Sequence, residues 1–70
     1  MLYVIKRLSD SYYISSFEEC RGVMYCITYT PIQTDALKFP QKVAERYSNM
    51  LNKERNDVHK AVSAIKEKEI

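Results

Sequence analysis

The sequence predicts a small α+β domain in which a three-stranded antiparallel β-meander is packed by a C-terminal helix, in the order β-β-β-α. Two observations support this class. Before Phe39-Pro40, β-branched and aromatic residues alternate at period two, and five of the six tyrosines lie in this part. After it, apolar residues recur at three- and four-residue steps among charged residues. Side chains alternate across a strand but return to one helix face every 3.6 residues, so the change of period marks the passage from sheet to helix.

Length and composition limit the class of protein. We expect residues 1–70 to form a single domain, with a sheet at 1–30, a connection at 31–39 and a helical part at 40–68. The net charge of +2 lacks the strong basic footprint of nucleic-acid-binding proteins. Two cysteines and one histidine cannot supply four zinc ligands, and two cysteines are too few for a disulfide framework. The sequence shows no signal peptide or membrane span, so we expect a cytoplasmic protein without metal or cofactor.

The strands are predicted from segments rich in Tyr, Ile, Val, Phe and Thr, at residues 2–7, 12–17 and 23–30. Residues 8–11 form the first turn, because Ser and Asp side chains bond their own backbone. Gly22 is the only glycine, and we place it at the left-handed position of a three-residue loop, residues 20–22. This register puts Glu19 opposite Val23.

The predicted register divides the sheet into two faces. The helix is expected to cover the face that carries Leu2, Val4, Tyr13, Phe17, Val23, Tyr25, Ile27 and Tyr29. The other face should be polar if it met water, yet it carries Tyr3, Ile5, Tyr12, Ile14 and Met24. Because a large exposed apolar patch usually marks an interaction site, these five are the predicted partner-binding residues. Two alternatives stay open: the register differs by one residue, or the C-terminal tail wraps round this face.

A helix is predicted at residues 40–54. Pro40 suits a first-turn position, where its missing N–H is not needed. The apolar stripe, with Tyr47 and Leu51 at its centre, should pack on the sheet. The outward positions are Lys42, Glu45, Arg46, Asn49 and Lys53.

The tail, residues 56–68, is predicted to continue this helix or to form a second one, since Ala61, Ala64 and the neighbouring Lys and Glu residues favour helix. The alternative is a fourth strand at residues 58–65, in which Val58, Val62 and Ala64 alternate.

Catalytic chemistry is not indicated by any motif. His59 and Ser63 would lie one helix turn apart, but a nucleophile–base pair also needs an oxyanion donor and a cleft. Paired carboxylates, phosphate-binding glycines and metal-ligand spacings are absent from the sequence. We therefore expect no enzymatic activity and no catalytic residue.

The run Thr34-Asp35-Ala36-Leu37-Lys38-Phe39, followed by Val43-Ala44, resembles many short hypothetical proteins of phages and prophages. Those proteins have a small β-meander, then Ala-x-x-Phe, then a helix with alanine in its first turns. The resemblance covers about residues 12–53. It implies a compact α+β fold, a tail that often returns as a strand, and an accessory role in binding a host or phage protein. It implies no site residue.

The leading functional hypothesis is a small non-enzymatic protein-interaction module of this phage type, which binds and inhibits a host or phage protein in the host cytoplasm and forms a homodimer. The alternative is a small nucleic-acid-binding transcriptional regulator that uses Arg46, Lys53, Arg55 and Lys60.

Overall fold

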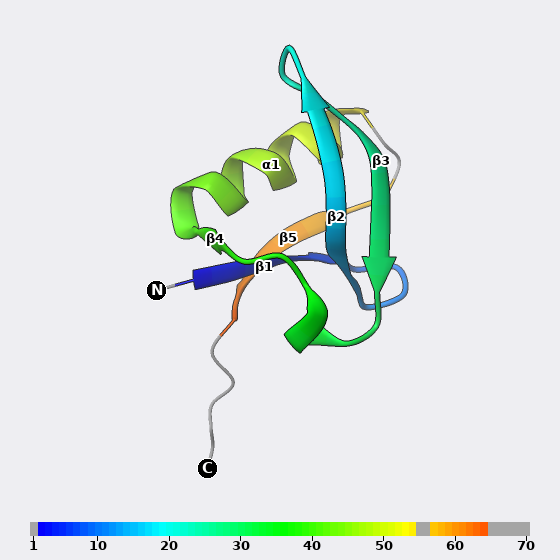
Figure 1. The fold of residues 1–70 in the computed structure, drawn as a ribbon, viewed down its shortest axis with the longest axis vertical. Coiled ribbons are helices and arrows are strands. Elements are labelled where there is room, and N and C mark those ends of the chain that lie inside the picture. The colour runs from blue at the N-terminus through cyan, green and yellow to red at the C-terminus, as the bar shows by residue number, and fades with distance from the viewer. Residues whose placement is uncertain (1, 55–56, 65–70) are drawn as a thin grey trace.

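The computed structural model describes residues 2–54 and 57–64. Within these residues the chain forms a five-stranded antiparallel sheet and one α-helix (Figure 1). The elements are β1 (Leu2–Arg7), β2 (Tyr12–Cys20), β3 (Val23–Thr30), the 3-10 helix η1 (Gln33–Asp35), β4 (Phe39–Pro40), α1 (Gln41–Glu54) and β5 (His59–Ser63). The predicted α+β class is confirmed, but the sheet has more strands than the three predicted.

Strand β1 is the centre of the sheet. Lys6 faces Tyr13 of β2 on one edge and Lys60 of β5 on the other. Tyr3 faces Phe39 of β4 and Ser63 of β5. Because a strand residue has one neighbour on each side, β2 and β4 share one edge of β1 and β5 runs along the opposite edge. The short β4 is therefore an outer strand of the sheet, directly before α1 in the chain.

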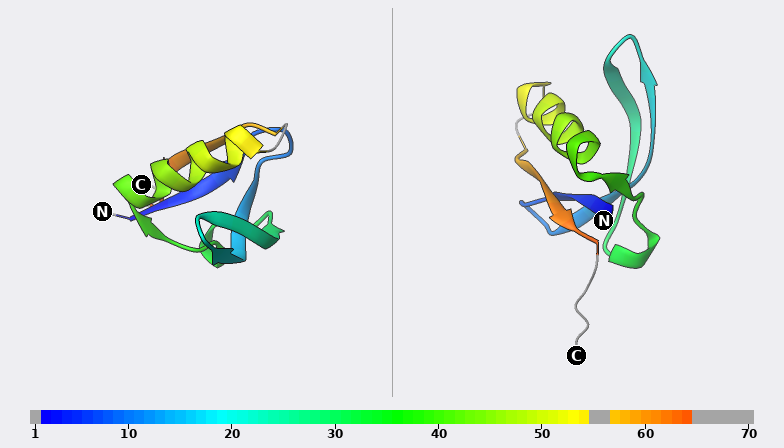
Figure 2. Two further views of the ribbon diagram at one scale, coloured as in Figure 1. Left: turned by 90° about the horizontal axis from the view of Figure 1, so that it is seen from above. Right: turned by 90° about the vertical axis from the view of Figure 1, so that its left-hand side faces the viewer.

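The helix lies in the angle between two parts of a bent sheet. Figure 2 shows α1 running along β1 and β5 while the β2–β3 hairpin rises beside it. The bend arises because β2 pairs with β1 at only two positions, next to the first turn. The buried cluster inside this angle comprises Ile5, Ile14, Met24, Ala44 and Leu51. The predicted helix is confirmed from Gln41 to Glu54, and Leu51 is buried at its centre as expected. Pro40, however, lies in β4 and not in the first turn of the helix.

The division into a covered face and an open face is wrong. Ile5, Ile14 and Met24, expected on the open face, are at most 4% exposed, whereas Leu2 and Tyr25 of the supposedly covered face are 46% and 40% exposed. On β1 both faces are covered, since the adjacent residues Val4 and Ile5 are each 0% exposed. The central strand therefore offers no open apolar face.

The physical reason lies in two irregularities of the β2–β3 pairing. Strict alternation puts Ile14 and Phe17 on opposite faces, but the register shifts between Ile14 and Glu18, and Cys26 adopts a positive φ of 55°. Each irregularity resets the alternation along its strand. Ile14 and Phe17 thus both pack against the core, and so do Met24 and Ile27. The two predicted faces merge into one interior.

The predicted loop between β2 and β3 is one residue too long. Cys20 pairs with Val23, so the turn consists of Arg21 and Gly22, with φ of 54° and 79°. Two consecutive positive φ values define the turn that best matches the right-handed twist of a hairpin, and Arg21 accepts this conformation in place of the usual Asn. Glu19 consequently faces Met24 and not Val23.

The helical tail is also wrong within the described residues. His59–Ser63 forms β5, as the alternative of a fourth strand at residues 58–65 proposed. Residue 65 of that strand, and residues 56 and 65–68 of the predicted helical tail, lie outside the described residues. β5 satisfies the second edge of β1, whose backbone N–H and C=O groups would otherwise lose their partners in a buried strand. This long-range pairing outweighs the local helix propensity of the alanines and lysines.

Candidate functional site

The predicted partner-binding residues do not gather on the surface. Ile5, Ile14 and Met24 lie in the core, and Tyr3 is half-buried against it. Tyr12, at 36% exposed, remains accessible beside the first turn. The site was predicted from an apolar patch exposed to solvent, and that exposure is wrong for the three core residues.

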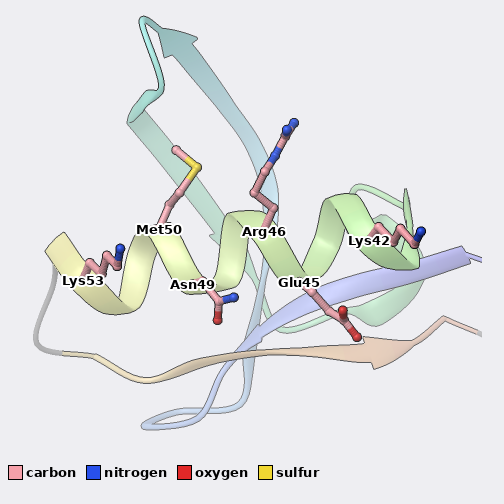
Figure 3. A pocket seen from close by; sticks show the side chains of 6 residues that line it. All are labelled: Lys42, Glu45, Arg46, Asn49, Met50 and Lys53. Atoms are coloured by element: carbon pink, nitrogen blue, oxygen red, sulfur yellow. The ribbon is translucent and has the colours of Figure 1, made fainter.

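The accessible polar surface lies on α1 instead (Figure 3). Six residues at three- and four-residue steps line an open depression of about 390 Å³: Lys42, Glu45, Arg46, Asn49, Met50 and Lys53. This spacing is that of one helix face, so the depression follows the outward side of α1. Five of the six are the outward positions predicted from the sequence, and Met50 is the half-buried exception.

A second depression, of about 310 Å³, lies between α1 and β5. Its lining residues are Glu45, Ser48, Asn49, His59, Lys60 and Ala61. It shares Glu45 and Asn49 with the first, so the two depressions form one continuous surface. Ser48 is the buried polar residue of α1 in this lining, and its Oγ has no hydrogen-bond partner among the described residues.

Four cations belong to this surface, and we call Lys42, Arg46, Lys53 and Lys60 the basic face. Glu45 is the one carboxylate among the lining residues, and it accepts a hydrogen bond from Gln41 Nε2 at 3.2 Å. Within the part of the chain that the structure describes, the single ion pair is Arg7–Asp10. None of the four cations forms an ion pair with a carboxylate there, and they outnumber the single carboxylate of Glu45, so the surface attracts anionic groups.

The helix that carries the basic face is fixed against the hairpin by Tyr47. Its hydroxyl donates to Glu19 Oε1 at 2.8 Å, and its ring stands edge-on to Phe17 and Phe39, with centroids 5.3 and 5.5 Å away. The hydrogen bond to Glu19 raises the pKa of Tyr47, because the carboxylate favours the protonated phenol. These contacts join α1, β2 and β4 into one support.

His59 is part of a buried polar cluster. It is 3% exposed; its Nδ1 lies 3.2 Å from the Asp57 carbonyl oxygen and its Nε2 3.0 Å from Tyr29 Oη. Because a carbonyl only accepts, Nδ1 donates to Asp57, and Nε2 and the Tyr29 hydroxyl form the second hydrogen bond. Ser63 is four residues further along a strand, about 13 Å away at 3.3 Å per residue. The predicted proximity of His59 and Ser63 on one helix turn is therefore wrong.

Neighbouring groups complete this cluster. The Arg7 guanidinium lies 3.8 Å from the centroid of the Tyr29 ring and binds both carboxylate oxygens of Asp10, at 3.1 and 2.6 Å. The hydrogen bond to Arg7 lowers the pKa of Asp10. The Asn52 side chain forms two hydrogen bonds with the first residue of β5. Its Oδ1 accepts from the His59 N–H at 2.7 Å, and its Nδ2 donates to the His59 carbonyl at 3.1 Å. The cluster thus joins β1, β3, α1 and β5.

The side chains that could bind a metal ion do not gather at one place in the described ranges. Residues 2–54 and 57–64 contain no group of three or more His, Cys, Asp or Glu side chains placed to hold a metal ion. Cys20 and Cys26 are exposed free thiols. The described part also contains no helix with the length and apolarity needed to span a bilayer.

Comparisons of the chain with models of known families, with curated proteins and with solved structures find no match.

Proposed function

We propose that this chain is a small non-enzymatic module that binds a protein, with the phage-type accessory role of modulating a host or phage protein. The basic face of α1 and β5 makes the contact, and the partner presents an acidic surface. The observation that carries the proposal is the group of four cations on one open surface, without carboxylate partners among the described residues.

The form of the surface favours a macromolecular partner. Both depressions are open and lie side by side along a helix, so a small molecule would remain largely in water. An exposed helix face with separated cations and one apolar side chain, Met50, suits a protein surface, because Met adapts to irregular contacts. Charge complementarity would then orient the partner and speed its association.

A nucleic-acid-binding regulator is the second candidate. Three of the cations predicted for that role, Arg46, Lys53 and Lys60, line the same continuous surface, and the fourth, Arg55, lies outside the described residues. Against this reading, Glu45 lies in the middle of the surface and would face phosphates. The net charge of the chain is also only +2.

The test is a binding comparison between two single charge reversals. Arg46→Glu changes the basic face, and Arg21→Glu makes the same charge change at the exposed hairpin turn. The probes are a labelled polyglutamate peptide, a DNA duplex and a single-stranded RNA, each measured by fluorescence anisotropy at low and moderate salt. We expect the parent chain and Arg21→Glu to bind polyglutamate, and Arg46→Glu to bind it about tenfold more weakly.

Polyglutamate binding that Arg46→Glu leaves unchanged would contradict the proposal. Binding to DNA or RNA but not to polyglutamate, lost in Arg46→Glu and steeply dependent on salt, would replace it with the nucleic-acid alternative.

A further inference from the structure

The outer strand β3 has an unusual composition for the edge of a sheet. It pairs with β2, and no pairing along its other side occurs within the described residues. None of its eight residues is Asp, Glu, Lys or Arg, and it contains no proline. Soluble proteins commonly guard long edges with charges, prolines, bulges or short length, because the outward N–H and C=O groups are a template for another strand. Of these guards, β3 has only the irregularity at Cys26.

Two other strands of the same sheet are also outer strands: β4, which has only two residues and includes Pro40, and β5, which provides the comparison here. β5 has five residues, carries Lys60, and pairs with β1. It is therefore short and charged, as guarded edges usually are. β3 is longer and uncharged, so β3 and β5 differ in two of the properties that limit strand addition at an edge.

We infer that β3 is the interface of a homodimer in which the β3 strands of two copies pair antiparallel about a twofold axis. The absence of charge argues for a second copy over a foreign strand. About a twofold axis, each residue i of one copy meets a residue j of the other, and j meets i. A strand without charges therefore meets no charge in its copy, whatever the register. A foreign strand that carries charges would place them against an uncharged edge, without a partner of opposite sign.

Exposed apolar side chains beside the edge give the pairing a further driving force. Val23 and Tyr25 are 45% and 40% exposed, and tyrosine is enriched at protein interfaces. The irregularity at Cys26 leaves residues 23–25 and 27–30 as regular stretches on either side of it. Pairing would satisfy the outward backbone groups of these stretches and bury part of the two side chains.

The dimer would leave the basic face accessible. The proposed interface consists of β3 residues and shares none with the helix face that carries Lys42, Arg46 and Lys53. The inference is therefore independent of the proposed function: one concerns the edge of β3 and the other the outward side of α1.

The experiment is sedimentation velocity over a concentration series with three chains. The parent chain is compared with Tyr25→Lys/Thr28→Lys, which adds two cations to exposed positions of β3, and with Leu8→Lys/Ile32→Lys, which adds the same charge at exposed positions outside it. We expect the parent and the Leu8/Ile32 variant to dimerise alike. The β3 variant should dimerise at least about tenfold more weakly, because like charges meet across the pair.

A parent chain that stays monomeric over the whole series, or a β3 variant that dimerises as well as the parent, overturns the inference. Thermal unfolding followed by circular dichroism establishes that the β3 variant is folded.

A second measurement avoids charge changes in β3. In a Cys20→Ser chain, a spin label on Cys26 reports the distance between two copies. Antiparallel pairing keeps the two Cys26 positions within one strand length, about 26 Å for eight residues at 3.3 Å each. A dipolar distance in that range, allowing for the label arms, supports the β3 interface. A dimer without such a distance overturns it.

Discussion

Three residues other than glycine adopt positive φ among those described, Ser11, Arg21 and Cys26, and each marks a place where the chain changes direction or register. The left-handed region costs an ordinary L-residue about 1–2 kcal/mol, and glycine is exempt. Cys26 is the informative case, because it lies inside a strand, where sequence patterns assume extended backbone. No feature of a cysteine signals this conformation, so the irregularity that merges the two predicted faces could not be predicted.

Replacing Cys26 with glycine should stabilise the fold. Cys26→Gly relieves the positive φ and should raise the free energy of unfolding by about 1 kcal/mol, whereas Cys26→Val should lower it. The control is Cys20→Gly at the end of β2, where φ is not positive and glycine should cost about 0.5–1 kcal/mol. Urea denaturation measures all three. Equal losses for the two glycine variants would show that the backbone at position 26 is not left-handed in solution.

The hydrogen bond of Tyr47 should make the free energy of unfolding depend on pH in the alkaline range. The pKa of Tyr47 is raised in the folded chain by the hydrogen bond to Glu19, from a usual value of about 10. The stabilisation is therefore complete below the unfolded pKa and is lost as pH rises through the folded one. Tyr47→Phe removes the bond and should lower the free energy of unfolding at pH 7 by about 1 kcal/mol.

The measurement is the difference in unfolding free energy between the parent and Tyr47→Phe, taken from neutral pH upward. It should shrink above about pH 10. Tyr25→Phe, an exposed tyrosine on β3, is the control and should differ little from the parent at any pH. A Tyr47→Phe difference that is constant with pH would mean that the phenol–carboxylate contact is absent in solution.

At the scale of elements, Asn52 fastens the C-terminal strand to the helix. Both of its side-chain hydrogen bonds go to the backbone of His59. Asn52→Ala leaves that N–H and C=O without these partners in a part-buried position, so it should cost about 1–3 kcal/mol. Hydrogen exchange at the amides of Ala61 and Val62 should become faster, because β5 opens more readily.

Asn49→Ala is the matched control for this change. Asn49 is exposed on the same helix, and its replacement should change stability by less than about 0.5 kcal/mol. Equal effects of the two alanine variants would contradict the role assigned to Asn52.

Elements held by local patterns were predictable, and those held by distant pairing were not. The alternation of residues 2–7 and the stripe from Ala44 to Leu51 predict β1 and α1 correctly, and the first turn gives the observed pairing of Arg7 with Tyr12. The prediction of a helical tail was wrong because its alanines and lysines favour helix locally, while the open edge of β1 offers a ladder of backbone hydrogen bonds. That edge becomes visible only when the sheet is assembled.

The same distinction applies to the candidate site. The outward positions of α1 follow from helical spacing, so Lys42, Arg46 and Lys53 could be placed together in advance. Lys60 was expected on a helix and reaches the basic face from β5. The supposed partner-binding face failed because the sheet bends and both sides of β1 are covered, which no pattern in residues 2–7 reveals.

At the scale of the whole molecule, two surfaces with different properties lie on different elements. One is the basic face on α1 and β5, and the other is the uncharged edge of β3. A dimer through β3 would present two basic faces, and linked sites of this kind bind a repeated or dimeric acidic partner more tightly than one site does. The Tyr25→Lys/Thr28→Lys chain should therefore match the equally charged Leu8→Lys/Ile32→Lys chain in affinity for a monovalent acidic probe and show lower avidity for an immobilised one.

The central claim is that the basic face is the binding surface, and backbone NMR of the labelled chain tests it most directly. Titration with the polyglutamate peptide at low salt should shift the amide resonances of Lys42, Arg46, Lys53 and Lys60 most, and added salt should reverse the shifts. No shift at any peptide concentration, or shifts centred on the hairpin turn at Arg21 and Gly22, would contradict the account.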